Sequence, residues 1–308
     1  MFEFHADRKR YFDIQVLNAE KYVIPFIEEK FPVKAGMRVL EIGCGEGGVL
    51  KAFINKGCEG VGVELDAPRI VDANKFLPDD IAAGRLRFVV KDIYEVDIEK
   101  DFNGLFDIVI LKDVIEHIHD QAKLIGWMKK FLKPEGIVFF GFPPWYMPFG
   151  GHQQMCHSKI SKLPYIHLLP RGVYKWILKK KKEPVEALME VRDTGISIER
   201  FVRICKKEGY SLPYNRHYFL NPIYEWKFGW KPKRQSLIIK SIPFVRNFFT
   251  TCVYYIIQPI ISCYVMLVLS HPYPKNFFGI LIQFCFYIQK SLPVIKATSN
   301  KFTIRRAL

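Results

Sequence analysis

A turn of glycines constrains the fold of this 308-residue chain more than any other feature. It occupies residues 41–48 (EIGCGEGG), directly after an apolar strand pattern at residues 37–40 and before a helical pattern. Glycines in such a turn let the backbone approach a ligand that any Cβ atom would push away. Gly43, Gly45 and Gly48 also satisfy the G-x-G-x-x-G spacing, which alone is a weak signal. The turn therefore predicts a strand-turn-helix unit that binds a ligand.

Two acidic residues narrow the class of ligand. Glu41 stands two residues before the first glycine, where its charge would repel a pyrophosphate but not a cationic group. Glu64 ends a second apolar strand pattern 23 residues later (64 − 41), the usual place for an acid that binds ribose hydroxyls. An acid facing an amino group and an acid facing a ribose describe a nucleoside joined to an amino acid. S-adenosylmethionine is such a molecule.

Three further segments follow in a recognisable order: residues 88–93 (FVVKDI), 106–118 (FDIVILKDVIEHI) and 132–140 (LKPEGIVFF). With the glycine turn, they make residues 36–142 resemble the class I S-adenosylmethionine-dependent methyltransferases of the small-molecule type, although Glu135 stands where a glycine is commoner. The resemblance implies S-adenosylmethionine as cofactor. It places the cofactor contacts at Glu41, Gly43, Cys44, Gly45, Glu64, Leu65, Asp92, Ile93, Lys112 and Asp113.

The periodicity of apolar residues predicts the architecture. Residues 13–31 have helical spacing, and strand patterns then alternate with helices near residues 48–55, 66–76 and 121–132. Such alternation is typical of βαβ units and a parallel sheet, so an α/β fold is expected. The resemblance makes this a Rossmann-like, doubly wound, mostly parallel sheet of seven strands, closed by a capped helix at residues 197–209 and a last strand near residues 250–258.

The chain is expected to divide into three parts. A helical cap at residues 1–35 precedes a methyltransferase domain at residues 36–258, and an apolar and basic extension covers residues 259–308. Within the domain, a lid is expected to be inserted after strand five, at about residues 145–193.

The loop after strand five is the expected acceptor side. Residues 141–154 (GFPPWYMPFGGHQQ) are too rich in proline and glycine to continue a strand or begin a helix. Trp145, Gln153 and Gln154 could stack on an acceptor and hydrogen-bond to it. An oxygen or nitrogen acceptor must also lose a proton, for which His152 is the first candidate base and His117 the second. The alternative for either histidine is a positioning or packing role.

A metal site is not expected. His117 and His119 lie beside Glu116, but their spacing has no recognisable ligand pattern. The seven cysteines form no Cys-x-x-Cys pair, which indicates reduced thiols rather than disulfides or a zinc site. The first residues lack the apolar run of a secretion signal. These features predict a cytoplasmic protein.

Charge is distributed unevenly along the chain. The formal net charge is +15, yet residues 1–150 carry −4 and residues 151–308 carry +19. The positive half is the one in which the acceptor is expected to bind, which favours an anionic partner. A phosphorylated or acidic metabolite, an anionic lipid surface and a nucleic acid all fit this charge. Solvated lysine-rich loops such as residues 179–182 are the alternative that implies no partner.

Residues 248–270 contain no charged side chain, and residues 276–289 form a second uncharged run. The first run is long enough to span a bilayer, but Pro259 interrupts it and residues 250–258 have the β-branched and aromatic pattern of a core strand. Three interpretations stay open: a transmembrane helix, a membrane-surface or partner-binding extension, and packing on the domain or disorder. The second would make the protein membrane-associated through its tail.

Three classes of function follow. The first is methyl transfer, by in-line displacement, to the oxygen or nitrogen of a small-molecule or lipid-intermediate acceptor. The second is a nucleic-acid methyltransferase, but residues 141–145 resemble the Asn-Pro-Pro-aromatic motif only superficially and no RNA-binding module is evident, so nucleic acid is not the expected partner. The third is a membrane-associated scaffold that binds S-adenosylmethionine without turnover.

Overall fold

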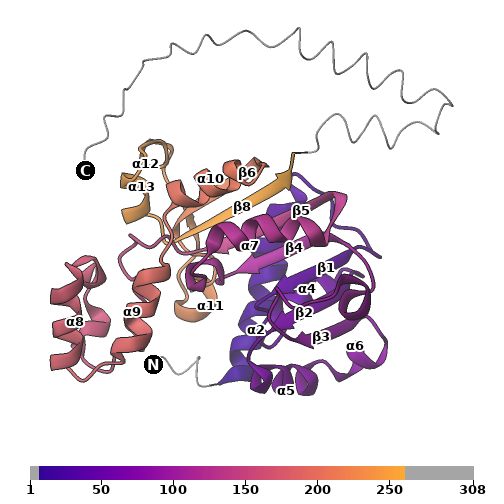
Figure 1. Cartoon of the computed structure of the whole chain (residues 1–308), viewed down its shortest axis with the longest axis horizontal. Coiled ribbons are helices and arrows are strands. Elements are labelled where there is room, and N and C mark those ends of the chain that lie inside the picture. The colour runs from indigo at the N-terminus through magenta and orange to yellow at the C-terminus, as the bar shows by residue number, and fades with distance from the viewer. Residues whose placement is uncertain (1–6, 261–308) are drawn as a thin grey trace, which may run out of the picture. The chain divides into compact units, whose positions relative to one another are not determined.

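The computed structural model describes residues 7–260, which lie within one compact unit, and Figure 1 shows a central sheet with helices on both faces. One helical stretch opens it: α2 (Arg8–Asn18), a π-helical turn (η1, Ala19–Val23) and α3 (Ile24–Glu28). The expected helix at residues 13–31 is thus confirmed, but it begins earlier because the Asp7 carboxylate caps α2 by accepting the Arg10 N–H.

Eight strands form a single sheet in the order β3-β2-β1-β4-β5-β8-β6-β7. Strands β1 to β5 pair in parallel, and β8 runs antiparallel to both of its neighbours. This confirms the mostly parallel, Rossmann-like α/β fold. The expected number of seven strands is wrong, because a two-residue strand, β7, pairs with the edge of β6. The strands are β1 (Arg38–Ile42), β2 (Glu59–Glu64), β3 (Leu86–Val90), β4 (Phe106–Lys112), β5 (Leu132–Phe142), β6 (Tyr210–Leu220), β7 (Lys233–Arg234) and β8 (Cys252–Pro259).

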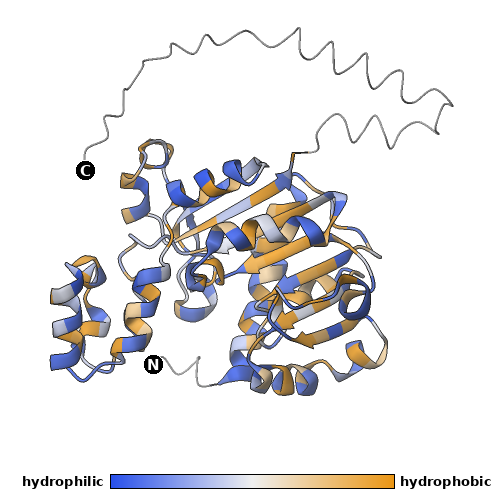
Figure 2. Cartoon of the chain, viewed as in Figure 1, coloured by the Kyte–Doolittle hydropathy of each residue, from blue (hydrophilic) through white to orange (hydrophobic). Residues whose placement is uncertain are grey.

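Two apolar clusters cover the two faces of the sheet. Val39 and Ile108 pair across β1 and β4 and contribute to the cluster under α2, α3 and α4, whereas the next pair, Leu40 and Val109, contributes to the cluster under α7 and α10. Figure 2 shows the strands as largely hydrophobic between helices that alternate in colour. The connecting helices are α4 (Gly48–Asn55), α5 (Ala67–Phe76), α6 (Pro78–Ala82), η2 (Ile98–Phe102), η3 (Ile115–His117), α7 (Gln121–Trp127), η4 (Met128–Phe131) and α10 (Ile198–Lys207).

Between β5 and α10 the chain forms a separate group of short helices. They are η5 (Gln153–Met155), η6 (Lys159–Lys162), η7 (Ile166–Leu168), α8 (Arg171–Lys180) and α9 (Val185–Thr194). They pack around an apolar cluster of their own, which includes Tyr174, Leu178 and Leu188. The Gln121 side chain in α7 donates to the Thr194 carbonyl at 2.6 Å, which ties the end of α9 to the domain. That these helices move as a lid stays a prediction.

The chain then completes the sheet through α11 (Tyr224–Phe228), α12 (Leu237–Ser241), α13 (Val245–Phe248) and β8. Residues 253–257 of β8 are all buried, so the β-branched and aromatic pattern there is that of a core strand. The interpretation of residues 248–270 as one transmembrane helix is therefore wrong. None of the helices in residues 7–260 combines the length and hydropathy that crossing a bilayer requires. Residues 276–289, and most of the expected extension, lie outside the described residues.

Candidate functional site

Glycines shape the turn at the carboxyl end of β1. Gly43, Gly45 and Gly47 have φ values of 70°, 54° and 80°, conformations that residues with a Cβ atom rarely adopt. Gly48, which opens α4, permits a close approach, because a Cβ there would lie 2.7 Å from the backbone oxygen of Phe12 in α2. Glycine is therefore required by the backbone conformation of the turn and by the packing of α4 on α2, and the approach of a ligand to the turn stays a prediction.

The carboxylate of Glu64, the last residue of β2, holds this turn. Its Oε2 accepts the Gly45 N–H at 2.8 Å, and its Oε1 accepts the N–H groups of Leu65 and Asp66 at 2.9 and 3.0 Å. These charge-assisted hydrogen bonds link the glycine turn to the start of α5. The Leu65 side chain projects outward with 71% of its surface exposed. The ribose contact of Glu64 stays a prediction.

Glu41 lies in β1 with 3% of its surface exposed, and its Oε2 has no hydrogen-bond partner among the described residues. The pKa of its carboxyl is raised to about 8, chiefly by burial and to a smaller extent by Glu64 and Asp113, while Lys112 and the backbone of Leu50 oppose the shift. A buried carboxylate oxygen without a partner is costly. A ligand group that donates a hydrogen bond to this atom would remove that cost, and the sequence predicts an ammonium at this position.

Lys112 and Asp113 stand at the end of β4. The Lys112 side chain is 4% exposed, and its ammonium forms an ion pair with the Asp113 carboxylate. Burial disfavours the charged ammonium, but the charge and hydrogen bond of Asp113, together with Tyr11 and Cys252, outweigh burial and raise the Lys112 pKa. Asp113 has a φ of 58°, and its N–H donates to the Gly141 carbonyl at 2.7 Å. Strained backbone of this kind concentrates at functional sites.

The remaining predicted cofactor residues lie around the same edge of the sheet. Asp92 follows β3 and accepts the Tyr94 N–H at 2.9 Å, and Ile93 beside it is buried. The Cys44 side chain belongs to the apolar cluster under α4. Burial raises the pKa of its thiol, so thiolate chemistry is disfavoured and only the backbone of Cys44 is left for a ligand.

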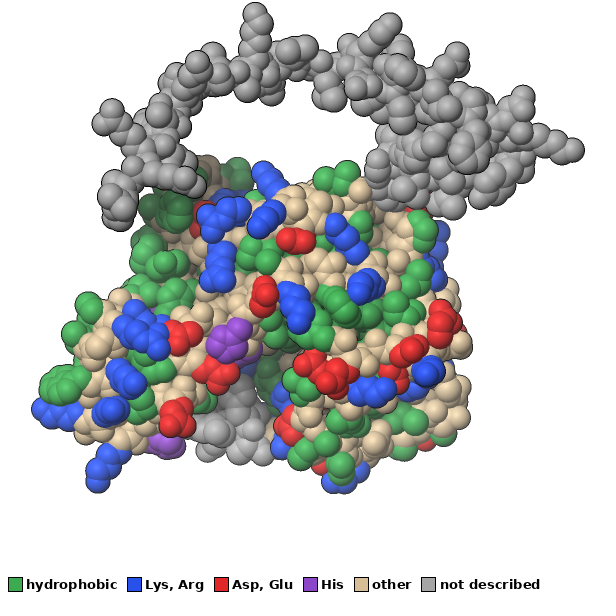
Figure 3. Space-filling model, in the orientation of Figure 1, with side chains coloured by type: hydrophobic (Ala, Val, Ile, Leu, Met, Phe, Trp, Pro, Cys, Tyr) green, Lys and Arg blue, Asp and Glu red, His purple; other side chains and the backbone are tan. Residues whose placement is uncertain are grey.

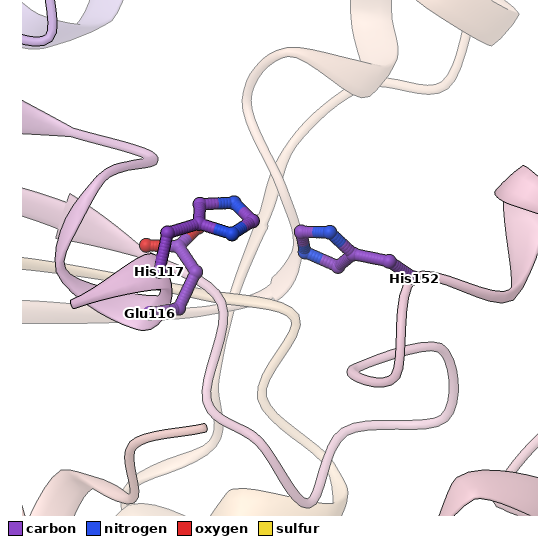
Figure 4. A group of neighbouring side chains, drawn as sticks. All are labelled: Glu116, His117 and His152. Carbon is purple, nitrogen blue, oxygen red and sulfur yellow. The ribbon is translucent and has the colours of Figure 1, made fainter. Parts of the chain in front are cut away.

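The structure brings the two candidate bases together, although 35 residues separate them in the sequence (152 − 117). Figure 4 shows the rings of His117, in η3 after β4, and His152, in the loop after β5, pointing toward each other. Their centroids lie 4.9 Å apart. Desolvation lowers the pKa of His117, while Asp113 and Glu190 oppose the shift, so the neutral ring can accept a proton at pH 7.

Glu116 completes a group with these histidines. It is buried, and within residues 7–260 its Oε2 has no hydrogen-bond partner. Burial and the Asp113 charge raise its pKa well above the ordinary value. Ligand atoms of Glu116, His117 and His152 all lie within 4.8 Å of one another, so they could hold a metal ion. His119, which sequence reasoning considered as a ligand instead of His152, is not in this group and faces Glu190 at 3.7 Å.

The predicted acceptor residues make contacts within the protein. The Trp145 ring packs on His167, at a centroid distance of 4.6 Å, and a Cβ on Gly195 would lie 2.5 Å from it. Gln153 is buried, and its Nε2 donates to His167 Nδ1 at 2.9 Å. The Trp145 carbonyl can only accept a hydrogen bond, so His167 Nε2 carries the hydrogen and donates it at 2.8 Å. His167 Nδ1 is then the acceptor for Gln153. Gln154 is half-buried. An acceptor role for Trp145, Gln153 and Gln154 stays a prediction.

Arg69 in α5 joins the site, and the sequence analysis missed it. Its guanidinium carbon lies 3.2 Å from the place that a Cβ on Gly45 would take, and its Nε donates to Glu46 at 3.1 Å. The positive charge beside the glycine turn therefore belongs to Arg69, which is paired with Glu46. No local motif distinguishes Arg69 from a surface residue, because only the packing of α5 beside the turn brings it here.

Tyr11 in α2 and Lys227 in α11 approach the same edge of the sheet. The Lys227 ammonium lies 5.0 Å from the centre of the Tyr11 ring, and both side chains interact electrostatically with Lys112 and Asp113. Burial lowers the pKa of Lys227 to about 8, and Lys112 adds to that shift while Asp113 opposes it. Elements from both ends of the described chain thus contribute cationic and phenolic groups to the site.

A sequence profile of a methyltransferase domain matches residues 17–157, which include the glycine turn and the His117 turn. Residues 17–157 are therefore a methyltransferase domain of the S-adenosylmethionine-dependent kind. The methyltransferase is 24% identical over 202 residues to the ubiquinone biosynthesis O-methyltransferase of Acinetobacter baylyi, which covers 64% of this chain and 76% of the relative. It is 25% identical over 207 residues to the Pseudomonas aeruginosa protein described in the same words, covering 66% and 80%.

Solved structures with the same fold include a putative sarcosine dimethylglycine methyltransferase from Galdieria sulphuraria. Its TM-score is 0.51 at 14% identity, and the match covers 78% of the methyltransferase and 85% of that chain. A geranyl diphosphate methyltransferase in complex with SAM has a TM-score of 0.50 at 15% identity, covering 78% and 84%. At these identities the likeness shows the fold alone.

The residues at the carboxyl ends of β1, β2 and β4 fit the cofactor of this family, S-adenosylmethionine. Glu41 provides a buried carboxylate oxygen without a partner, and the glycine turn leaves space for close backbone approach. A separate cleft of about 530 Å³, lined by residues such as Arg38, Arg85 and Arg87, opens toward the opposite ends of the strands. That cleft is not part of the site.

Proposed function

We propose that this methyltransferase transfers a methyl group to a hydroxyl oxygen of a small, anionic acceptor, with His152 as the base. One observation carries the proposal: His152 faces His117 at 4.9 Å, beside the strand ends where the cofactor residues gather. The relatives described as O-methyltransferases support oxygen as the acceptor atom. N-methylation is the alternative that the same histidines would serve.

The reaction requires that the protein position the acceptor, exclude water and provide one proton acceptor. Bound S-adenosylmethionine supplies an electrophilic methyl group. The chain holds the acceptor hydroxyl in line with the bond that breaks and keeps water out. His152 would take the hydroxyl proton on a ring nitrogen, so that the acceptor oxygen could receive the methyl group that bound S-adenosylmethionine supplies. The His117 ring, which packs edge-on against His152, orients the His152 ring.

Lys227 supports an anionic acceptor. It is half-buried beside Asp113, where an acceptor carboxylate or phosphate would favour its charged form. The apolar residues Tyr146 and Phe149 leave 38% of their surfaces exposed in the loop that holds His152. An acceptor with an acidic group and an apolar body, such as an acidic phenol or a lipid intermediate, matches both features.

Transfer of labelled methyl from S-adenosylmethionine into fractions of a cell extract tests the proposal. We expect label in a hydroxylated, acidic metabolite or lipid fraction, and its persistence after nuclease treatment. His152→Ala should lower the rate of labelling roughly a hundredfold. His119→Ala is the matched control, since His119 is an exposed histidine of the neighbouring turn. Label confined to nucleic acid would refute the proposed acceptor. Cofactor binding without any label would favour the scaffold.

A further inference from the structure

Residues 237–249 expose an unusual number of large apolar side chains. Figure 3 shows hydrophobic side chains gathered at the edge where Figure 1 places α12 and α13. We call this set the α12–α13 surface. Its members, with their exposed fractions, are Leu237 (81%), Ile238 (75%), Ile242 (41%), Phe244 (65%) and Phe249 (45%). The surfaces of soluble proteins rarely carry adjacent apolar side chains of this size unless a partner or a membrane covers them.

The backbone under the α12–α13 surface is anchored, so the exposure does not come from a frayed loop. Glu199 in α10 accepts hydrogen bonds from the Phe244 N–H at 3.0 Å and from Arg246 Nε at 2.9 Å. Its other oxygen accepts the side-chain amide of Asn247, which is itself buried. Phe244 is held at a φ of 62°, a conformation that non-glycine residues seldom adopt. The fold therefore fixes these apolar side chains in water.

Charge indicates what covers the surface. Lys231, Lys233 and Arg234 are exposed just before it in the chain, and residues 226–260 contain no Asp or Glu. Lys231 and Arg234 interact with Glu225 and Glu29, but their side chains stay exposed. Aromatic and aliphatic side chains beside exposed basic ones are the composition of segments that lie on anionic membrane surfaces.

We propose that the α12–α13 surface docks on an anionic lipid bilayer. Leu237, Ile238 and Phe244 enter the headgroup region, and the three basic residues contact lipid phosphates. The surface adjoins the acceptor side, because the Phe248 ring lies 5.5 Å from the Tyr146 ring and its carbonyl accepts the Tyr165 hydroxyl at 2.9 Å. Docking would therefore hold the loop that carries His152 close to the lipid. It does not depend on which acceptor is methylated.

Vesicle cosedimentation of the full chain tests the proposal. The probes are phosphatidylcholine vesicles with and without phosphatidylglycerol. Each basic residue near an anionic surface strengthens binding by about fivefold, so three predict roughly a hundredfold preference for the anionic vesicles, lost at high salt. Equal binding to both vesicles would overturn the proposal.

Two variants locate the docking surface. Leu237→Glu with Ile238→Glu should weaken binding to anionic vesicles at least tenfold, whereas Val71→Glu, at a 54% exposed position of α5, should not. The second variant combines Lys231→Gln, Lys233→Gln and Arg234→Gln, and it should remove the preference for anionic vesicles. It tests the proposal even if the first variant misfolds. S-adenosylhomocysteine binding monitors folding of each. Unchanged vesicle binding in both folded variants would assign the binding elsewhere in the chain, and binding to nucleic acid or protein but to neither vesicle would refute the lipid surface.

Discussion

Glu41→Gln should change stability and cofactor affinity in opposite directions, and both changes should depend on pH. The folded-state pKa of about 8 exceeds the ordinary 4.5 by 8 − 4.5 = 3.5 pH units. At about 1.36 kcal/mol per unit, ionising the buried carboxyl opposes folding by roughly 5 kcal/mol. Between pH 4.5 and 8 the folded protein keeps a proton that the unfolded chain has lost, so this contribution to stability is lost as pH rises.

The variant cannot ionise and escapes this penalty. We expect the free energy of unfolding of Glu41→Gln, relative to the native protein, to rise from near zero at pH 4.5 to several kcal/mol above pH 8. Urea unfolding of the cofactor-free proteins measures this difference. Glu59→Gln is the control for the loss of a charge, because Glu59 is exposed at the first residue of β2.

Cofactor affinity should behave in the reverse way. A charged hydrogen bond contributes about 1.5 to 3 kcal/mol, but ionising Glu41 at pH 7 costs about 1.4 kcal/mol, one pH unit below its pKa. The advantage of the native protein should therefore be small at pH 7 and grow severalfold by pH 8.5, with proton release on binding. Calorimetry with S-adenosylhomocysteine in two buffers would measure both the affinity and the number of protons released on binding. Parallel affinity profiles for the two proteins would refute the assignment of Glu41 to the ligand's amino group.

Three further predictions concern neighbouring groups. Glu64→Ala should weaken cofactor binding by about 1 to 3 kcal/mol, because the N–H groups of Gly45, Leu65 and Asp66 lose their acceptor, and unchanged calorimetric affinity in a folded variant would contradict this. His152→Ala should keep cofactor affinity but lose roughly a hundredfold in transfer rate, and a flat pH profile for an active His152→Gln would show a positioning role instead. Treatment with a chelator should leave the transfer rate unchanged, and a loss that divalent cations restore would make Glu116, His117 and His152 a metal site.

Local pattern in the sequence is sufficient for much of the fold. The helix Gly48–Asn55 has the expected bounds, and α10 begins after its predicted cap, Ser197, whose hydroxyl accepts the Arg200 N–H. These features depend on residues a few positions apart, where helical spacing and capping act. Strand β7 could not be foreseen in this way, because two exposed residues carry no periodicity and become a strand only by pairing with β6.

The site was predictable where a strand end fixes a residue and not where packing brings one in. Glu41, Glu64 and Asp113 follow from the alternation of strands and helices, since carboxyl ends of parallel strands share one edge. Lys227 lies in a five-residue helix far along the chain, and its approach to Tyr11 depends on how α11 packs. The opposite error is possible as well. Gln153 was predicted to contact the acceptor because it is a polar residue in the loop after β5, but its side chain is buried and hydrogen-bonds to His167.

The position of β8 has a consequence for how the chain is made. The strand synthesised last among residues 7–260 lies inside the sheet, between β5 and β6. During synthesis, the outer edge of β5 therefore remains unpaired until about residue 259 has left the ribosome, and open strand edges invite aggregation. Emergence of β8 from the ribosome, rather than the appearance of the cofactor motifs, would set the moment at which this enzyme becomes safe from misassembly.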